Sequence, residues 1–151
     1  MRKSLCLLVF LTLVTFRAKA QNTASNAENE VKAVIRQLFD GMRRGDSAAV
    51  RAAFYPGSRL QTTAVDKTGK PVLSTGSTDA FVKAVGTPHP DVWDERLTGI
   101  EIRVDDNLAT AWTPYEFYAG SKFSHRGVNA FQLFRSEAGW KIIAITDTRR
   151  K

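Results

Sequence analysis

The last third of the chain contains four long segments in which apolar and polar residues alternate as they do in strands. These segments are residues 95–104, 108–118, 122–134 and 140–148. The connections between them are the turn sequences Asp105-Asp106-Asn107, Gly120-Ser121 and Ser136-Glu137-Ala138-Gly139. Connections this short can join only antiparallel neighbours, because a parallel neighbour needs a crossover of a dozen or more residues. The sequence therefore predicts a long antiparallel meander.

The first half of the chain has the pattern of three helices and one hairpin. The predicted helices are residues 30–44, 47–54 and 78–86, and the predicted hairpin strands are residues 59–65 and 70–74. Gly45 ends the first helix, Asp46 caps the second, and Ser77 or Thr78 caps the third, which ends near Gly86. Helices followed by antiparallel strands favour the α+β class. We expect a curved antiparallel sheet with the three N-terminal helices packed in its concave face, an arrangement that encloses a pocket.

The N-terminal segment has the three zones of a signal peptide. Arg2 and Lys3 form a basic start, residues 5–16 are apolar, and Ala18-Lys19-Ala20 places small residues at both positions read by signal peptidase. We predict cleavage after Ala20. The alternative is a membrane anchor, for which the apolar run is shorter than the roughly 20 residues that span a bilayer.

The signal-peptide prediction divides the chain into three parts. Residues 1–20 are the signal peptide, residues 21–29 are a polar, flexible lead-in, and residues 30–151 form one domain. The protein is then exported, either to the periplasm or as a secreted protein, with no stable membrane insertion after cleavage. The sequence does not choose between these two destinations.

Charge and cysteine content exclude several functional classes. The leader holds four basic residues and no acidic one, so its removal reduces the formal net charge from +7 to +3. A basic charge that lies largely in a discarded leader is poor evidence for nucleic-acid binding. The single cysteine, Cys6, lies in the leader as well, which excludes disulfides and thiol catalysis in the mature chain. With only two histidines, far apart, we expect neither a metal site nor a cofactor.

The short turns give an estimate of the register of the meander. One face is predicted to carry small and branched residues: Ile100, Ile102, Val104, Ala109, Ala111, Thr113, Val128, Ala130, Ile143 and Ile145. The other is predicted to carry the larger and more polar residues: Leu108, Trp112, Glu116, Tyr118, His125, Asn129, Phe131, Leu133, Trp140, Ile142 and Ala144. We assign the second face to the concave side, under the helices. The first is flat enough to pack on a second copy, which suggests a homodimer.

This register places polar groups among aromatic side chains on the concave side. Glu116 lies opposite His125, and Trp112 lies opposite Asn129, so the members of each pair can touch. An apolar pocket with a few convergent polar groups is the usual form of a small-ligand site. Pro114 leaves an alternative open, because it cannot donate to the ladder and implies a bulge. Such a bulge would replace Glu116 and Tyr118 in the pocket by Tyr115 and Phe117.

Further candidate ligand contacts follow from their position in this scheme. Trp93 follows a proline-rich loop and could close the mouth of the pocket, and Asp147 falls near the end of the last strand. His125 could act as an acid or base with Glu116 or Asp147, or be a buried structural histidine. Asp91, Asp94 and Glu95 could bind a hard cation, although a solvated loop explains them better.

The order of the elements and several short motifs resemble a known superfamily. The stretches that carry the resemblance are Ala33–Met42, Gly45-Asp46, Phe54-Tyr55-Pro56, Phe123–Phe131, Gly139–Ile142 and Asp147–Arg150. They resemble the nuclear-transport-factor-2-like superfamily, and within it the branch described as putative lumazine-binding. The resemblance implies a cone-shaped α+β domain with a pocket at its open end, and often a homodimer through the sheet. Steroid-isomerase-like members use a tyrosine and two acids, but the first helix here has no tyrosine, so no isomerase site is carried over.

Three functional hypotheses follow. The first is an exported small-molecule-binding protein with an unidentified organic ligand held by Trp112, Glu116, Tyr118, His125 and Asn129, together with Trp93 and Asp147. The second is an enzyme of the isomerase, dehydratase or cyclase type that uses His125 as its acid or base. The third is a protein-interaction module, which should have a closed, dry cone. Binding without catalysis leads, because no catalytic motif is present.

Overall fold

The computed structural model describes residues 25–151. A first helix covers residues 25–44. The elements that follow are α2 (Ser47–Ala53), β1 (Phe54–Val65), β2 (Pro71–Ser77), α3 (Thr78–Gly86), β3 (Trp93–Leu97), β4 (Glu101–Asp105), β5 (Leu108–Ala119), β6 (Lys122–Ser136) and β7 (Gly139–Thr148). The predicted signal peptide lies outside the described residues. The helix predicted from residue 30 extends back to residue 25, into the segment predicted as a flexible lead-in, and buries Ala27 there.

The helices form where the caps predict them. The Asp46 side chain accepts a hydrogen bond from the Ala49 amide at 2.9 Å and begins α2. Ser77 caps α3 in the same way, through the amide of Ala80. Between the first helix and α2, Gly45 adopts a φ of 68°, a conformation that side-chain-bearing residues rarely adopt.

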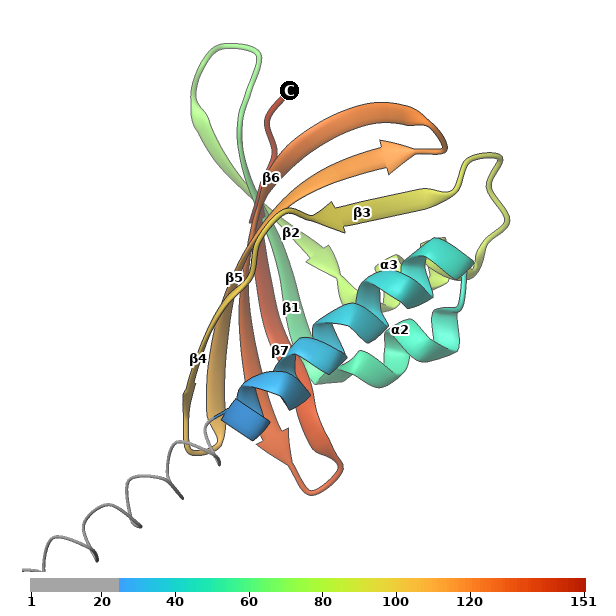
Figure 1. Ribbon diagram of the computed structural model, residues 1–151. Coiled ribbons are helices and arrows are strands. Elements are labelled where there is room, and N and C mark those ends of the chain that lie inside the picture. The colour runs from blue at the N-terminus through green and yellow to red at the C-terminus, as the bar shows by residue number, and fades with distance from the viewer. Residues whose placement is uncertain (1–24) are drawn as a thin grey trace, which may run out of the picture.

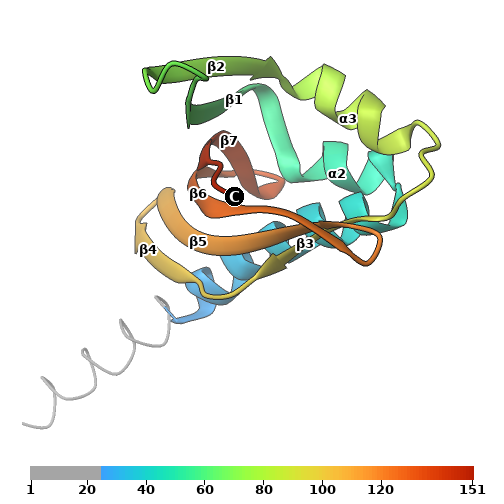
Figure 2. The same ribbon diagram turned by 90° about the horizontal axis from the view of Figure 1, so that it is seen from above.

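One mixed sheet contains all the strands, in the order β2-β1-β7-β6-β5-β3, and β4 also pairs with β5. Its pairings are antiparallel except for that of β1 with β7, which is parallel. The sheet is curved, and the helices lie against its inner face (Figure 1). From above, the strands enclose one side of the molecule and the helices cover the other (Figure 2). The predicted α+β cone is confirmed, with one parallel pairing that the sequence did not indicate.

The core lies between the first helix and the inner face of the sheet. Val31, Ile35 and Leu38 recur along one side of the helix and are fully or almost fully buried. They face sheet residues such as Phe131, which meets Phe39 edge to face with ring centroids 6.2 Å apart. This packing holds the first helix against the inner face of the sheet.

Two bulges correct the predicted register. The hairpin between β5 and β6 closes at the predicted turn, but Ser124 is an extra residue in β6, so Phe117 pairs with His125 and Glu116 pairs with Arg126. Between β6 and β7, Ile143 is the extra residue. Each extra residue moves the rest of its strand by one position, which changes the face on which every later side chain lies.

Because of these shifts, the predicted division of residues between the two faces is wrong in part. Ala109, Ala111 and Thr113, predicted for the outer face, are buried under the helices. Leu108 and Trp112, predicted for the inner face, are each 51% exposed. The small and branched residues proposed as a dimer surface therefore belong largely to the core, and the homodimer itself stays a prediction.

Pro114 causes no bulge, because it lies where its strand needs no donor. The pairing of β5 runs without interruption from Leu108 to Phe117. On the other side of β5, the predicted strand over residues 95–104 is broken into β3 and β4, and Pro114 lies beside that break. There its carbonyl accepts a hydrogen bond from the Thr98 amide at 2.9 Å, and its ring lies against Gly99. The missing N–H thus coincides with a gap in the neighbouring strand.

Candidate functional site

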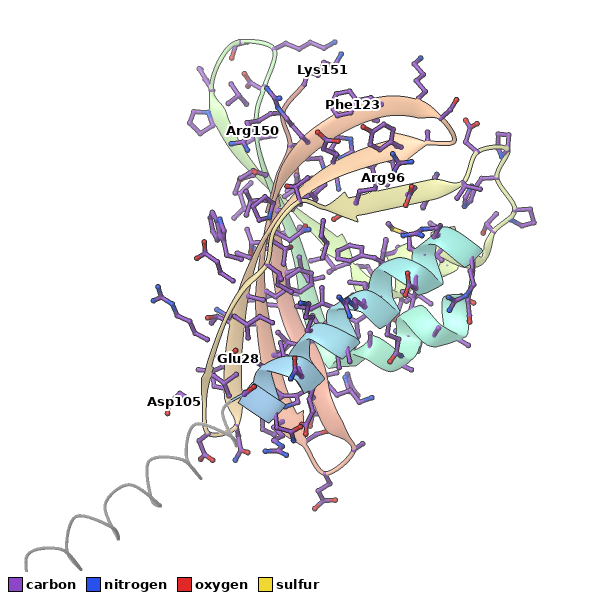
Figure 3. All side chains as sticks on the ribbon, in the orientation of Figure 1. Glu28, Arg96, Asp105, Phe123, Arg150 and Lys151 are labelled. Carbon is purple, nitrogen blue, oxygen red and sulfur yellow. The ribbon has the colours of Figure 1, made fainter. Side chains whose placement is uncertain are left out.

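A cavity of about 650 Å³ opens between the inner face of the sheet and the helices. It lies toward the end of the molecule that carries Arg96 and Phe123, away from Glu28 and Asp105 (Figure 3). Its apolar walls come from three directions: Leu38, Phe39 and Met42 of the first helix, Ala80, Phe81 and Ala84 of α3, and Leu60, Trp93, Phe117 and Ile145 of the sheet. Its titratable groups lie on β3, β5, β6 and at the end of β7, and further polar side chains come from β1 and β2.

Asp147 is the most heavily bonded polar group of the cavity. Its two carboxylate oxygens accept hydrogen bonds from the hydroxyl groups of Thr62 and Tyr115 and from Nε of Arg149, the last at 2.9 Å. The parallel pairing of β1 with β7 places Thr62 directly beside Asp147. The Asp147 side chain is only 10% exposed, so its charge is held by fixed donors within the protein.

Tyr115 lines the cavity, and its protonated hydroxyl group is a hydrogen-bond donor there. Its hydroxyl lies 3.2 Å from Asp147 and 3.0 Å from the carbonyl of Thr148. Burial, together with the negative charges of Asp147 and Glu95, raises the pKa of Tyr115 well above its ordinary value. The phenol is therefore a neutral donor throughout the physiological pH range.

Glu95 is a second, partly buried carboxyl group in the same cavity. Its Oε1 accepts a hydrogen bond from Nδ2 of Asn129 at 2.7 Å, and Asn129 lies within 3.4 Å of the Thr113 hydroxyl. Burial raises the pKa of Glu95 to about 7, and the hydrogen bond from Asn129 offsets only part of that effect. The negative charge of Asp147 raises it further. Glu95 therefore exchanges its proton near neutral pH.

His125 lines the cavity between two aromatic rings. It stacks on Phe117 at 5.0 Å and meets Tyr115 edge to face at 5.8 Å. Its Nδ1 lies 3.1 Å from the hydroxyl of Ser124. Burial and the positive charge of Arg149 lower the pKa of His125, so its neutral form predominates at neutral pH.

The structure brings together four of the seven predicted ligand-contact residues. Trp93, His125, Asn129 and Asp147 all line the cavity. Trp93 stacks on His89 at 4.4 Å, in the loop that precedes β3. The ligand-binding role of these residues stays a prediction.

The other three predicted residues lie on the opposite face of the sheet. Trp112 is half exposed there. Glu116 accepts a hydrogen bond from the Tyr118 hydroxyl at 2.9 Å, and the guanidinium of Arg96 lies 4.0 Å above the Tyr118 ring. The predicted pairs Glu116–His125 and Trp112–Asn129 are therefore wrong, because the extra residue Ser124 shifts β6 by one position.

Glu95 and Tyr115 are site residues that the leading sequence interpretation missed. Tyr115 appeared only in the alternative register, and Glu95 only as the first residue of a predicted strand and as a possible cation ligand for which a solvated loop was preferred. The usable signal for Glu95 was its position between Trp93 and Leu97, because residues two apart in a strand share a face. An acid at an inward position between two apolar residues indicates a functional carboxyl group rather than a solvated one.

Neither a membrane-spanning helix nor a metal-binding cluster of side chains occurs among residues 25–151. None of the helices there combines the length and the apolar character needed to cross a bilayer. In the same range, no three His, Cys, Asp or Glu side chains lie together in a way that could hold a metal ion.

The sequence family follows from a comparison that covers most of the domain. The model of the family described as "Putative lumazine-binding" matches residues 26–146, from the first helix into β7. The chain belongs to this family. The resemblance to the putative lumazine-binding branch noted in the sequence is confirmed. Among curated proteins, no relative matches the chain significantly.

Solved structures share the fold of this family member at low sequence identity. An NTF2-like protein with a cystatin-like fold from Novosphingobium aromaticivorans aligns with a TM-score of 0.67 and 14% identity, covering 99% of this chain and 91% of that one. An NTF2-like protein from Shewanella baltica gives 0.61 and 17%, covering 84% and 96%. A putative dehydratase from Streptomyces avermitilis gives 0.62 and 12%, covering 84% and 98%. At these identities the likeness establishes the fold alone.

Proposed function

We propose that the protein binds a small organic molecule in the cavity at the open end of the cone. The observation that carries this proposal is the cavity itself: its volume of about 650 Å³ lies within the range of small-ligand sites, roughly 300–1,000 Å³. Its walls are mainly apolar, and its polar groups are held in place by hydrogen bonds. The description of the family supports the same reading. An interaction module would instead have a closed, dry cone.

A thermal-shift screen of the protein against flavin precursors, pterins, steroids, polyketides and small organic acids tests the proposal. A ligand that binds only the folded state stabilises it by about 2.7 kcal/mol at a hundredfold excess over its dissociation constant. We expect at least one class to raise the melting temperature, and Trp93→Ala to abolish the shift because Trp93 forms part of the cavity wall. Trp112→Ala is the matched control on the outer face and should keep the shift. Loss of the shift in both variants, or no shift with any class, contradicts the proposal.

Proton transfer on the bound molecule is a second candidate function. It is favoured by one observation, the carboxyl group of Glu95 with a pKa of about 7 on the wall of an apolar cavity. A general acid or base works best with a pKa near the operating pH. Glu95 thus fits that role better than His125, whose pKa is lowered. If the protein is an enzyme, Glu95→Gln should abolish turnover while the protein stays folded. If the Glu95→Gln variant keeps its turnover rate, Glu95 is not the general acid or base.

We also propose that the protein acts outside the cytoplasm, on the strength of the basic start, apolar run and Ala18-Lys19-Ala20 sequence at its N-terminus. Expression of the full chain in a host with an intact secretion pathway, followed by mass spectrometry of the product, tests this. We expect the mature N-terminus at Gln21. An uncleaved product confined to the cytoplasm contradicts export.

A further inference from the structure

Glu95 is the carboxyl group of the cavity that still has capacity to bind a ligand. Both oxygens of Asp147 are occupied, one by Thr62 and the other by Tyr115 and Arg149. Glu95, by contrast, uses only Oε1, which accepts from Asn129 at 2.7 Å. Within residues 25–151, no donor is hydrogen-bonded to its Oε2. Glu95 is only partly buried, and its Oε2 is not one of the buried side-chain atoms that lack a partner, so a ligand in the cavity can reach this oxygen.

The charges that line the cavity do not balance once Glu95 is ionised. Asp147 is matched by Arg149, its partner at 2.9 Å. His125 and Tyr115 are neutral near pH 7, because the pKa of the first is lowered and that of the second is raised. The ionised cavity therefore carries one net negative charge, located on Glu95.

Among residues 25–151, no cationic side chain of the neighbouring elements forms an ion pair with Glu95. A second cavity, of about 520 Å³, lies between the first helix and β3 and shares only Phe39 and Glu95 with the first. The cationic side chains that line this second cavity are Lys32, Arg36, Arg43 and Arg96. None of these four lines the main cavity, and two of them are committed elsewhere, because Arg43 and Arg96 bind Asp94 at 2.9 and 2.7 Å.

Aromatic side chains line the cavity that Glu95 also lines. Phe39, Trp93 and Phe117 all line the cavity, and Glu95 pairs with Phe117 across β3 and β5. The face of an aromatic ring attracts a cation, by about 2 kcal/mol where water is excluded. An ionised carboxylate among aromatic walls is a suitable environment for an ammonium group attached to an apolar body.

We propose that the ligand of this cavity is a small organic cation, an amine on an apolar or aromatic body, whose ammonium group pairs with Glu95. This inference rests on the proposed function, since it names the chemical class of the molecule that the cavity binds. Asp147, held by Thr62, Tyr115 and Arg149, then serves as a fixed part of the wall rather than as the primary contact.

The proposed pairing couples binding to the release of a proton. Glu95 has a pKa of about 7 in the empty cavity, and only its ionised form attracts the ammonium group. A simple amine keeps its own proton up to about pH 9 or higher. The affinity for the amine should therefore increase about tenfold per pH unit below pH 7, and level off above it.

Calorimetric titration with matched probes tests the proposal. The probes are 2-phenylethylamine and tryptamine, each compared with its neutral alcohol, 2-phenylethanol and tryptophol. We expect the amines to bind more tightly than the alcohols, and their affinity to rise by about a hundredfold between about pH 5 and about pH 8. Titrations near pH 6 in two buffers of different ionisation enthalpy should show the release of about one proton. The alcohols should show neither effect.

Two variants complete the experiment. Glu95→Gln should remove the pH dependence and reduce the affinity for the amines at about pH 8 to the value of the wild type at about pH 5. Glu116→Gln, which changes a carboxylate on the outer face, should behave as wild type. The proton-release measurement needs no variant and so decides the question even if Glu95→Gln does not fold.

The outcomes separate this inference from the proposed function. If a neutral compound binds in a Trp93-dependent manner while the amines bind no better than the alcohols, the cation proposal is overturned and the binding function stands. Amine binding without pH dependence or proton release also overturns it. If neither the amines nor any neutral compound of the thermal-shift screen binds, both proposals fail together.

Discussion

We expect Glu95→Gln to stabilise the protein by about 2–3 kcal/mol at about pH 8 and to have little effect at about pH 4. The carboxyl group ionises near 4.5 in the unfolded chain and near 7 in the folded protein. A raised pKa means that the folded state binds the proton more tightly than the unfolded state. The contribution of this group to the free energy of unfolding is therefore fully present below about pH 4.5, and it is lost as the pH rises through 7. Glutamine never ionises, and its amide oxygen can still accept the hydrogen bond from Asn129.

Urea unfolding of both proteins across this pH range measures the effect. Glu101→Gln provides the matched control, because Glu101 is an exposed carboxylate on the neighbouring strand β4. Its substitution should change stability by less than about 0.5 kcal/mol at every pH. An equal stabilisation by Glu95→Gln at both ends of the range would contradict the raised pKa and would point instead to altered packing.

Much of the fold could be predicted from the sequence because its local signals are strong. Asp46 and Ser77 identify helix starts through their side chains, and the structure has both caps. The turns at Asp106-Asn107 and Gly120-Ser121 close hairpins at the predicted positions, with Asp106 and Gly120 at positive φ. Each of these features depends on a few neighbouring residues, so a single sequence is enough to find it.

The candidate site was harder to predict because it depends on register and on distant pairings. The alternation of β6 fits either face around Ser124, so the pattern does not reveal which residue is extra. That one residue decides whether Phe117 or Glu116 lies opposite His125. Thr62 reaches Asp147 only because β1 pairs in parallel with β7, a contact between residues 85 positions apart. Neither fact leaves a local trace in the sequence.

Gly127 is a position where a single methyl group should disrupt the site. An added Cβ would lie 1.8 Å from the carbonyl oxygen of Thr148 and 2.9 Å from Cε1 of Tyr115. Backbone cannot move aside as a flexible side chain can, so β6 and the end of β7 would have to separate. We expect Gly127→Ala to lower the free energy of unfolding by at least about 3 kcal/mol, measured by urea unfolding.

The same substitution should also weaken ligand binding in whatever protein remains folded. The Tyr115 hydroxyl donates to the Thr148 carbonyl, and Arg149, which follows Thr148 in the chain, donates to Asp147. Separation of the strands would therefore displace the donors that surround the Asp147 carboxylate. Gly76→Ala is the matched control for stability, because its Cβ would meet nothing closer than Leu60 Cβ at 3.8 Å. Gly76 has no positive φ, so alanine there should cost less than about 0.5 kcal/mol or stabilise β2 slightly. Equal losses of unfolding free energy in the two variants would contradict the predicted clash between the added methyl group and the Thr148 carbonyl.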